Sequence, residues 1–519
     1  MKQAKVSIIL HFPKEAPYGK DGFLRTVKSI FKQTSKNIEV VIIGEDSDLS
    51  AKIAEQNTSE LAVHFINNQA TLGESLNQAF KVTDSQYLMY IDNREAEIVL
   101  KQATIDLCLL TAHQEKDFGL IYGDYEINEN NQIKEIHLLK HHIGRVRDNQ
   151  DYGKVYFFNR KALESVGYCD ETLKYNTIYD LRLKVSEKYK LVHIANRYAG
   201  SLYTVKAKGK SQNVFDYLLA SKESQSESEK VLEKHLRRIG ANLEAGEHYG
   251  SRPAAPKETT LKASVIIPVN NRPKFTGMAI DSIQAQTVQD VEAIIVVNGG
   301  ENDPTVEAVK RYLPGGDKYN SNKPAVQLLV YDINNLGLCL NIGAWHAKGE
   351  YYVQLDSDDR LKPDAVEKIL AVYEKDPNIG MVIGSYEVWE MKDKGELNRM
   401  EDLPVVTHDE WTEENGRNNL LRIGGAGAPR SIPIQLIRNI GFSVNQEPYS
   451  RNYGEDYGMV LKISEKHRIG RVWDAIYEVI RHSGGTDHSI DQATVDRNDE
   501  AKDFLRKETI LRRIKLNQK

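Results

Sequence analysis

Three carboxylates occur within four residues in the second half of the chain, at Asp356, Asp358 and Asp359. They follow the apolar run 351–355, which is typical of a β-strand. Charges of one sign at this spacing repel one another unless water, basic groups or a cation face them. Carboxylate oxygens suit Mg²⁺ or Mn²⁺, which take one or two ligands from a protein and the rest from phosphates and water. The spacing therefore predicts a divalent metal site, with a helix cap as the alternative use of one carboxylate.

A second acidic pair, Glu455 and Asp456, precedes the amphipathic stretch 459–464. A carboxylate at the start of a helix is most often a cap. The alternative is a general base, since a helix start at a cleft can hold a carboxylate next to an acceptor hydroxyl. His482 follows the strand-like run 477–480 at the start of a Gly-rich turn. A lone histidine is most often a surface residue, but with the upstream carboxylates it could complete a metal site.

Small and amide side chains follow two other apolar runs of the same half. Pro268, Asn270 and Arg272 follow one run, and Asn298 follows the next run along the chain. Such residues end strands in ordinary turns. They also let a ligand approach the backbone and offer hydrogen bonds to a base or a ribose, so they are candidates for nucleotide binding.

An internal repeat reveals the elements that must position these residues. Segments of the first half recur in the second half in the same order, at offsets of 253 to 264 residues. The clearest pairs are Ser29-Ile30-x-x-Gln33-Thr34 with Ser282-Ile283-x-x-Gln286-Thr287, and Leu72-Gly73-x-x-Leu76-Asn77 with Leu336-Gly337-x-x-Leu340-Asn341. The glycine of the second motif lies 19 residues before an aspartate in each copy, Asp92 or Asp356. A repeat this long indicates two copies of one fold.

Each copy begins with β-branched apolar runs separated by a segment of helical period. This is the βαβ pattern of an α/β domain with a Rossmann-like, mostly parallel sheet. Such sheets bind ligands beyond the carboxyl ends of their strands. We expect one domain over residues 1–205, a helical linker over 206–261, a second domain over 262–490 and a basic amphipathic helix over 491–519.

Composition argues against several functional classes. The chain has 519 residues, enough for several domains, and its formal net charge of −5 provides no field for a polyanion, so no nucleic-acid partner is expected. Cys108, Cys169 and Cys339 lie far apart, which argues against a disulfide framework and favours a cytoplasmic location. No apolar run reaches the roughly 20 residues that cross a bilayer. The tail 501–519 could lie peripherally on the inner face of the cell membrane or pack on its own protein.

Taken together, these motifs resemble glycosyltransferase family 2, the inverting nucleotide-sugar-dependent transferases with the GT-A fold. The resemblance covers residues 262–490, with a degenerate copy over 1–205. It implies Mn²⁺ or Mg²⁺ at Asp358 with help from His482, and Asp456 as the catalytic base with Glu455 as the alternative. The nucleotide and donor contacts that it implies lie at Pro268, Asn270, Arg272, Asn298, Asn341 and Asp356.

The function implied by the resemblance is transfer of a sugar from a nucleotide diphosphate, with a UDP-sugar as the expected donor. The expected acceptor is a glycan or a lipid-linked saccharide in surface polysaccharide synthesis. Two alternatives stay open: a bifunctional polymerase with two active sites, and a sugar-binding scaffold without turnover. The acceptor is expected near residues 386–430, where Trp389, His408 and Trp411 either stack on a sugar or form local core.

The first copy lacks the reactive groups of the second. The acidic run of the second copy aligns with Asp92-Asn93-Arg94-Glu95, which puts Arg94 at the place of the expected metal ligand. A guanidinium repels a divalent cation. Thr177 and Ile178 align with the acidic pair, although Asp180 could substitute if the loop were two residues shorter, and no histidine stands at the place of the imidazole. We therefore expect the first domain to be catalytically silent.

Overall fold

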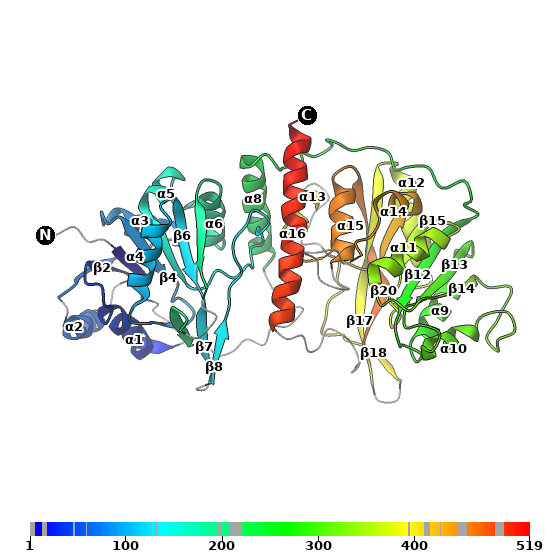
Figure 1. The fold of residues 1–519 in the computed structure, drawn as a ribbon, viewed down its shortest axis with the longest axis horizontal. Coiled ribbons are helices and arrows are strands. Elements are labelled where there is room, and N and C mark those ends of the chain that lie inside the picture. The colour runs from blue at the N-terminus through cyan, green and yellow to red at the C-terminus, as the bar shows by residue number, and fades with distance from the viewer. Residues whose placement is uncertain are drawn as a thin grey trace. The chain divides into compact units, whose positions relative to one another are not determined.

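The chain folds into two compact units, residues 1–239 and residues 240–519, in the computed structural model (Figure 1). The structure describes residues 6–12, 18–44, 47–58, 60–129, 132–195, 200–206, 221–392, 395–408, 416–425, 427–444, 454–482 and 492–518.

The first unit alternates strands and helices along its sequence. Its strands are β1 (Val6–His11), β2 (Ile38–Ile43), β3 (Ala62–Ile66), β4 (Tyr87–Ile91), β5 (Glu97–Leu100), β6 (Phe118–Gly123), β7 (Tyr125–Glu129), β8 (Gln132–Ile136), β9 (Val155–Asn159), β10 (Lys190–Ile194) and β11 (Tyr203–Lys206). Its helices are α1 (Gly19–Phe31), α2 (Ser47–Gln56), α3 (Leu72–Lys81), α4 (Thr104–Gln114), α5 (Arg160–Ser165), α6 (Thr177–Ser186) and α8 (Lys222–Arg238).

The second unit follows the same plan. Its strands are β12 (Leu261–Val269), β13 (Val291–Val297), β14 (Ala325–Val330), β15 (Gly349–Gln354), β16 (Arg360–Leu361), β17 (Ile379–Met391), β18 (Leu397–Arg399), β19 (Arg430–Pro433) and β20 (Arg468–Arg481). Its helices are α9 (Thr276–Gln284), α10 (Pro304–Lys310), α11 (Leu336–His346), α12 (Ala365–Lys375), α13 (Gly416–Asn419), α14 (Ile434–Ile440), α15 (Glu455–Ser464) and α16 (Gln492–Asn517).

The two main sheets have one topology. The strand order is β10-β6-β9-β4-β1-β2-β3 in the first unit and β20-β17-β19-β15-β12-β13-β14 in the corresponding part of the second. Neighbouring strands are parallel except around β9 and β19, each of which runs antiparallel to both neighbours. The predicted α/β fold with two mostly parallel sheets is confirmed.

Burial explains why these runs form central strands. Every residue of β1 and of β13 is buried, which is expected when helices cover both faces of a parallel sheet. β-branched residues suit this position because they pack well on a pleated surface. The continuous apolar runs in the sequence therefore mark the middle of each sheet.

The repeated motif residues make the same hydrogen bonds in both units. The Ser29 hydroxyl accepts from the Leu100 N–H at 3.1 Å, and the Ser282 hydroxyl accepts from the Leu361 N–H at 3.2 Å. The Gln33 side chain likewise joins α1 to the start of α4, as Gln286 joins α9 to the start of α12. The repeat therefore preserves a framework that fastens the first helix of each unit to the segment after its fourth strand.

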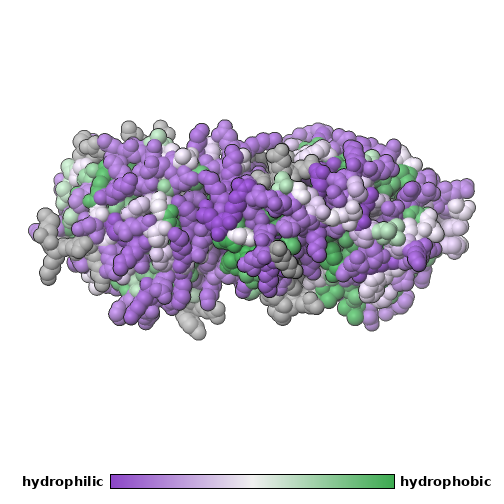
Figure 2. Space-filling view, turned by 90° about the horizontal axis from the view of Figure 1, so that it is seen from above, coloured by the Kyte–Doolittle hydropathy of each residue, from purple (hydrophilic) through white to green (hydrophobic). Residues whose placement is uncertain are grey.

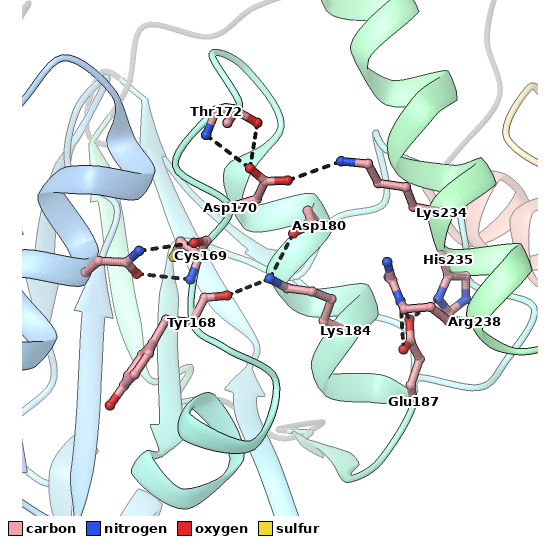
Figure 3. Close-up of polar contacts among 11 residues, drawn as sticks. Tyr168, Cys169, Asp170, Thr172, Asp180, Lys184, Glu187, Lys234, His235 and Arg238 are labelled. Carbon is pink, nitrogen blue, oxygen red and sulfur yellow. Dashed lines mark hydrogen bonds and ion pairs between the residues drawn. The ribbon is translucent and has the colours of Figure 1, made fainter.

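The helix expected in the linker, α8, packs on the first unit (Figure 3). Its Lys234 lies 3.2 Å from Asp170, and its His235 and Arg238 side chains both meet Glu187, at 2.7 and 2.9 Å. His235 is buried and Val231 and Leu232 are buried beside it on the same helix. The boundary between the units falls at residues 239 and 240, inside the expected linker.

The C-terminal helix α16 packs on α15 within the second unit. Its apolar residues Leu505 and Ile510 are buried, so the amphipathic pattern of the tail is used inside the protein. Arg506 is also buried, and it donates hydrogen bonds to the Leu421 and Ile423 carbonyls at 2.9 and 2.8 Å. The helix thereby holds the segment around α13 against α15.

Hydrophilic residues predominate on the face shown in Figure 2, and hydrophobic residues form small separate patches. This agrees with a composition in which 28% of the residues are charged. Within the described parts of the chain, no helix has the length and apolar character needed to cross a membrane.

Candidate active site

The candidate active site lies in the second unit, beyond the carboxyl end of β15. That strand ends at Gln354, and the acidic run 356–359 follows it directly. β19 begins at the same edge because it runs antiparallel to β15, and continuing that register by one residue places Arg430 opposite Gln354. Side-chain contacts then bring the end of β20 and the start of α15 to this edge.

Asp359 has a structural task within the acidic run. Its carboxylate accepts hydrogen bonds from the Tyr477 hydroxyl and from the Ile480 N–H, both at 2.8 Å. Burial raises the pKa of Asp359 well above its usual range, and the charges of Asp356 and Asp358 raise it further. Asp359 therefore fastens β20 to this loop and leaves the other two carboxylates for chemistry.

The two predicted metal ligands, Asp358 and His482, lie side by side. The His482 Nε2 atom is 3.0 Å from Asp358 Oδ2. The imidazole stacks on the Phe275 ring with centroids 4.1 Å apart, and only 6% of its side chain is exposed. This donor pair fits a Mn²⁺ or Mg²⁺ ion that takes its remaining ligands from phosphates and water. Over the described residues, no group of three or more such side chains could hold a metal by itself.

Asp356 is the first carboxylate of the run, and it is tied to its surroundings at two atoms. Its N–H donates to the Tyr477 hydroxyl at 3.1 Å, and its Oδ1 accepts from Gln354 Nε2 at 3.3 Å. Burial raises the pKa of Asp356, Arg430 lowers it and Asp358 raises it again, so that the pKa remains above its ordinary value. Mutual repulsion of this kind is what a bound cation would relieve.

The predicted acidic pair stands at the start of α15, directly after Gly454. Glu455 is buried, and burial together with the charge of Asp456 raises the pKa of Glu455 to about 7. Asp456 is more accessible, with 21% of its side chain exposed. Its Oδ1 accepts from the Tyr457 N–H at 2.7 Å, and its Oδ2 accepts from Arg430 Nη1 at 3.0 Å. Asp456 is therefore the more accessible member of the pair.

Arg430 is a functional candidate to which the sequence did not point. Besides Asp456, its guanidinium donates to the Gly427 carbonyl at 2.6 Å and to Gln354 Oε1 at 3.3 Å. The side chain is 13% exposed. Its only signal in the sequence is a single arginine after the small-residue run 424–429, and this does not reveal which carboxylate it meets.

The residues predicted to bind the nucleotide lie where β12 and β13 end. Asn270 is exposed, and its Nδ2 donates to Oδ1 of the buried Asn298 at 2.8 Å. Pro268 is the penultimate residue of β12, and Arg272 is half-buried just beyond that strand. The ends of these two parallel strands thus present one exposed amide that a buried amide holds in place.

The Asn341 side chain is engaged by backbone at both ends of its amide. Its Nδ2 donates to the Phe442 carbonyl at 3.0 Å, and its Oδ1 accepts from the Phe442 N–H at 2.8 Å. Asn77 makes the same two bonds with Cys169 in the first unit, at 3.1 and 3.0 Å. This amide ties a helix to a later loop in both units, which is a structural reason for its recurrence. The donor contact implied for Asn341 stays a prediction.

The first unit has different chemistry at the corresponding edge. Arg94 donates from Nε and Nη2 to the two oxygens of Asp92, at 2.8 and 3.0 Å. Burial raises the pKa of Asp92, but the Arg94 hydrogen bonds and charge lower it more, to about 2. The carboxylate is thus neutralised within its own loop.

The other reactive groups are also absent from their places in the first unit. α6 begins at Thr177, as α15 begins at Glu455, so Ile178 takes the place of the accessible aspartate. Asp180, the alternative carboxylate, is buried and turned toward Lys184 at 3.3 Å (Figure 3). In the sequence, Lys208 corresponds to the position of the imidazole, and it lies outside the described residues.

The aromatic residues expected near the acceptor make local contacts where they are described. The Arg360 guanidinium lies over the Trp389 ring at 5.5 Å, and the buried His408 ring lies 5.5 Å from Tyr386. Trp411 lies outside the described residues.

The family model for glycosyl transferase family 2 matches residues 8–93 and 264–424, one region in each unit. The chondroitin synthase of Pasteurella multocida strain Pm70 is 34% identical over 119 residues, which are 23% of this chain and 12% of that protein. An uncharacterised glycosyltransferase of Rickettsia typhi is 34% identical over 190 residues, which are 37% of this chain and 56% of that protein. The chain thus spans less than two thirds of these relatives' own length.

Among solved structures, S. aureus TarS 1–349 in complex with UDP-GlcNAc is 18% identical. That alignment covers 44% of this chain and 62% of the TarS chain, with a TM-score of 0.33. The family predicted from the motifs is confirmed by the two family matches.

Proposed function

Because each unit carries a region that belongs to glycosyltransferase family 2, we propose that the second unit transfers a sugar from a nucleotide diphosphate to an acceptor hydroxyl. The observation that carries this proposal is that the Asp358–His482 pair and the Asp456 carboxylate meet at one edge of one sheet. A donor-side and an acceptor-side group are both needed for such a displacement.

The proposed donor is a UDP-sugar bound across the ends of β12 and β13. The exposed Asn270 amide, supported by Asn298, can hydrogen-bond a base, and Arg272 and Asp356 are the proposed contacts to the diphosphate and the ribose. The proposed acceptor is a glycan or a lipid-linked saccharide of a surface polysaccharide. Relatives that are named chondroitin synthase and hyaluronan synthase support this choice of product class.

A Mn²⁺ or Mg²⁺ ion at Asp358 and His482 would neutralise the charge that develops on the diphosphate. The chain's own contribution is to hold these ligands. Phe275 fixes the plane of the imidazole, and Asp359 anchors the loop that carries Asp358.

Asp456 is the proposed general base. It accepts the proton of the acceptor hydroxyl while the acceptor oxygen bonds to the anomeric carbon. The bond from that carbon to the diphosphate oxygen breaks, and the nucleoside diphosphate leaves with the bonding electrons. Attack from the face opposite to the leaving group inverts the anomeric configuration.

The first unit is proposed to be catalytically silent. Its Asp92 carboxylate is held by Arg94, and Ile178 stands at the place of the base, which argues against a two-site polymerase. The proposed location is the cytoplasm, at the inner face of the membrane where the acceptor is lipid-linked. We do not assign membrane contact to α16, since Leu505 and Ile510 pack inside the second unit.

The proposal is tested by thermal shift of the full-length protein with a panel of nucleotide sugars, with Mn²⁺ or with EDTA. A ligand that binds only the folded state raises the melting temperature, so the true donor is expected to stabilise the wild type in Mn²⁺. The Asp358→Ala variant should lose this stabilisation. The Glu307→Ala variant, which changes a carboxylate that is 75% exposed, should keep it.

Transfer is then measured with the donor that the screen identifies. Equal stabilisation of Asp358→Ala and wild type would contradict the metal site. Absence of both stabilisation and transfer for every nucleotide sugar would favour the scaffold alternative instead.

A further inference from the structure

Resting on this proposed function, we propose that Arg430 is a positioning residue that locks the Asp456 carboxylate to the donor side of the site. Arg430 stands at the first position of β19, between the strand that delivers the acidic run and the helix that carries the base. It is not expected to touch the reacting atoms.

A continuous chain of hydrogen bonds connects the two sides of the site through Arg430. Its Nη1 donates to Asp456 Oδ2 at 3.0 Å, and its Nε donates to Gln354 Oε1 at 3.3 Å. Gln354 in turn donates from Nε2 to Asp356 Oδ1 at 3.3 Å. The Gly427 carbonyl accepts from the same Nη1 at 2.6 Å and fixes the plane of the guanidinium. A guanidinium suits this task because its donors have a rigid geometry.

This chain of hydrogen bonds sets the orientation of the Asp456 carboxylate. One carboxylate oxygen is engaged by the Tyr457 N–H and the other by Arg430, so the carboxylate cannot rotate without breaking a hydrogen bond. A base held in this way keeps its remaining lone pairs in one direction, which is the condition for rapid proton transfer.

The charge of Arg430 acts on the same groups. Burial lowers the pKa of Arg430, but Asp456 and Asp356 raise it more, so the guanidinium stays charged. The other groups that act on it are Tyr352 and Glu455. Glu455 has its pKa raised to about 7 by burial and by Asp456, and Arg430 opposes that rise. Without Arg430, Glu455 and Asp456 would lose the positive charge that faces both of them.

The first unit supplies a natural comparison. Met89 pairs with Phe157 there, as Val353 pairs with Ser431, so Tyr156 stands at the position of Arg430. Its ring stacks on Tyr90 with centroids 6.1 Å apart, in place of the link from guanidinium to amide. The arginine is therefore absent from the unit that also lacks the base, which is expected if its task is to position that base.

The test compares Arg430→Gln with Arg430→Lys in the full-length protein, using the donor identified by thermal shift. Arg430→Gln should lower kcat about 100-fold, which is typical for loss of one preorganised polar contact, and should change the donor KM by less than about threefold. The acidic limb of the pH profile of kcat/KM should move up by about 1–3 units, because a neighbouring positive charge is lost. Arg430→Lys keeps the charge, and its kcat should be about tenfold higher than that of Arg430→Gln.

A matched control and a double variant separate positioning from folding. Arg438→Gln removes an arginine of α14 that bonds the Ala344 carbonyl in the same unit, and it should leave the acidic limb in place. Arg430→Gln combined with Asp456→Asn should be no slower than Asp456→Asn alone, because both changes act on one proton transfer.

The outcomes distinguish this role from the proposed function. If Arg430→Gln only lowers the melting temperature, or if its effect multiplies that of Asp456→Asn, Arg430 is structural and the inference is overturned. If Arg430→Gln does not fold, a wild-type kcat in Arg430→Lys overturns it as well. A wild type without any transferase activity would overturn the proposed function itself.

Discussion

Gln354 and Arg430 stand opposite each other in the second unit, where Tyr90 and Tyr156 stand opposite each other in the first. The strands that carry these residues have the same order and the same directions in both units. The difference is therefore not in the fold but in the side chains at one edge of the sheet. It teaches that a sheet of this kind can keep its architecture after the groups that do chemistry are replaced.

The loops after β4 and β15 show how such a replacement works. Asp92 meets Arg94 within its own loop, whereas Asp358, which takes the place of Arg94, meets His482 just beyond the end of β20. An ion pair satisfies a carboxylate locally, while an aspartate paired with an imidazole retains capacity to bind a cation. One substitution thus turns a candidate metal ligand into a closed polar contact.

Removal of the proposed base should have the largest effect on activity, and only in the second unit. Asp456→Asn is expected to lower transfer about 10³-fold or more, because the amide cannot accept the acceptor proton, while donor binding is retained. The measurement is kcat with the identified donor, together with the thermal shift that the donor causes. The matched variant Asp180→Asn changes the buried carboxylate of the first unit and should leave kcat within about twofold. Wild-type turnover by Asp456→Asn would sink the assignment of the base.

The contact of α16 with α15 corresponds to the contact of α8 with α6 in the first unit, and it can be tested by stability. Leu505 is buried, and Leu505→Ala should destabilise the second unit by about 2–4 kcal/mol. Leu511, on the same helix, is 43% exposed, and Leu511→Ala should change stability by less than about 0.5 kcal/mol. Chemical denaturation of both variants checks this difference. Equal effects would contradict the packing of this helix.

The two units should respond to pH in opposite directions. Asp92 has its pKa lowered from 3.8 to about 2 in the folded state, so its contribution to stability is present above pH 4 and is lost as the pH falls toward 2. Glu455 has its pKa raised from 4.5 to about 7, so the folded state binds the proton more tightly. The second unit should therefore lose roughly 2–3 kcal/mol as the pH rises from 4.5 to 7.

Variants assign these pH effects to single groups. Glu455→Gln should flatten the pH dependence of the stability of the second unit between pH 4.5 and 7. Asp92→Asn should flatten the pH dependence of the stability of the first unit below pH 4. The measurement is the melting temperature across pH for each variant and for wild type. If the melting temperature of Glu455→Gln varied with pH as that of the wild type does, another group would be responsible for the effect.

The smallest expected effects come from the asparagines that both units share. Asn77→Ala and Asn341→Ala each leave a buried backbone carbonyl and N–H without their partner, which should destabilise each unit by about 1–3 kcal/mol. A structural role predicts similar losses in the two denaturation transitions and an unchanged donor KM. A rise of donor KM in Asn341→Ala alone would instead support the donor contact implied by the family resemblance.

The internal repeat makes the fold predictable from the sequence. Two aligned sets of apolar runs indicate two related sheets, and Ser29 and Gln33 recur as Ser282 and Gln286, which make the same hydrogen bonds in the second unit. A repeat of this kind is visible in the sequence because it depends only on residue types and their spacing. The boundary between the two units is harder to predict from the sequence, because α8 packs on the first unit through ion pairs with Asp170 and Glu187, which lie far from it in the chain.

The sequence by itself determined which residue types stand at the strand ends, and so identified Asp358, Asp456 and His482 as candidates. Only the tertiary structure decided how they are used. Arg430 lies 26 residues before Asp456 and 76 after Gln354, and no periodic pattern connects residues at such separations. Their contact exists because β19 runs antiparallel to β15 and brings its first residue to the same edge. The ionisation of buried carboxylates such as Glu455 likewise depends on desolvation and neighbouring charges, which the folded chain alone creates.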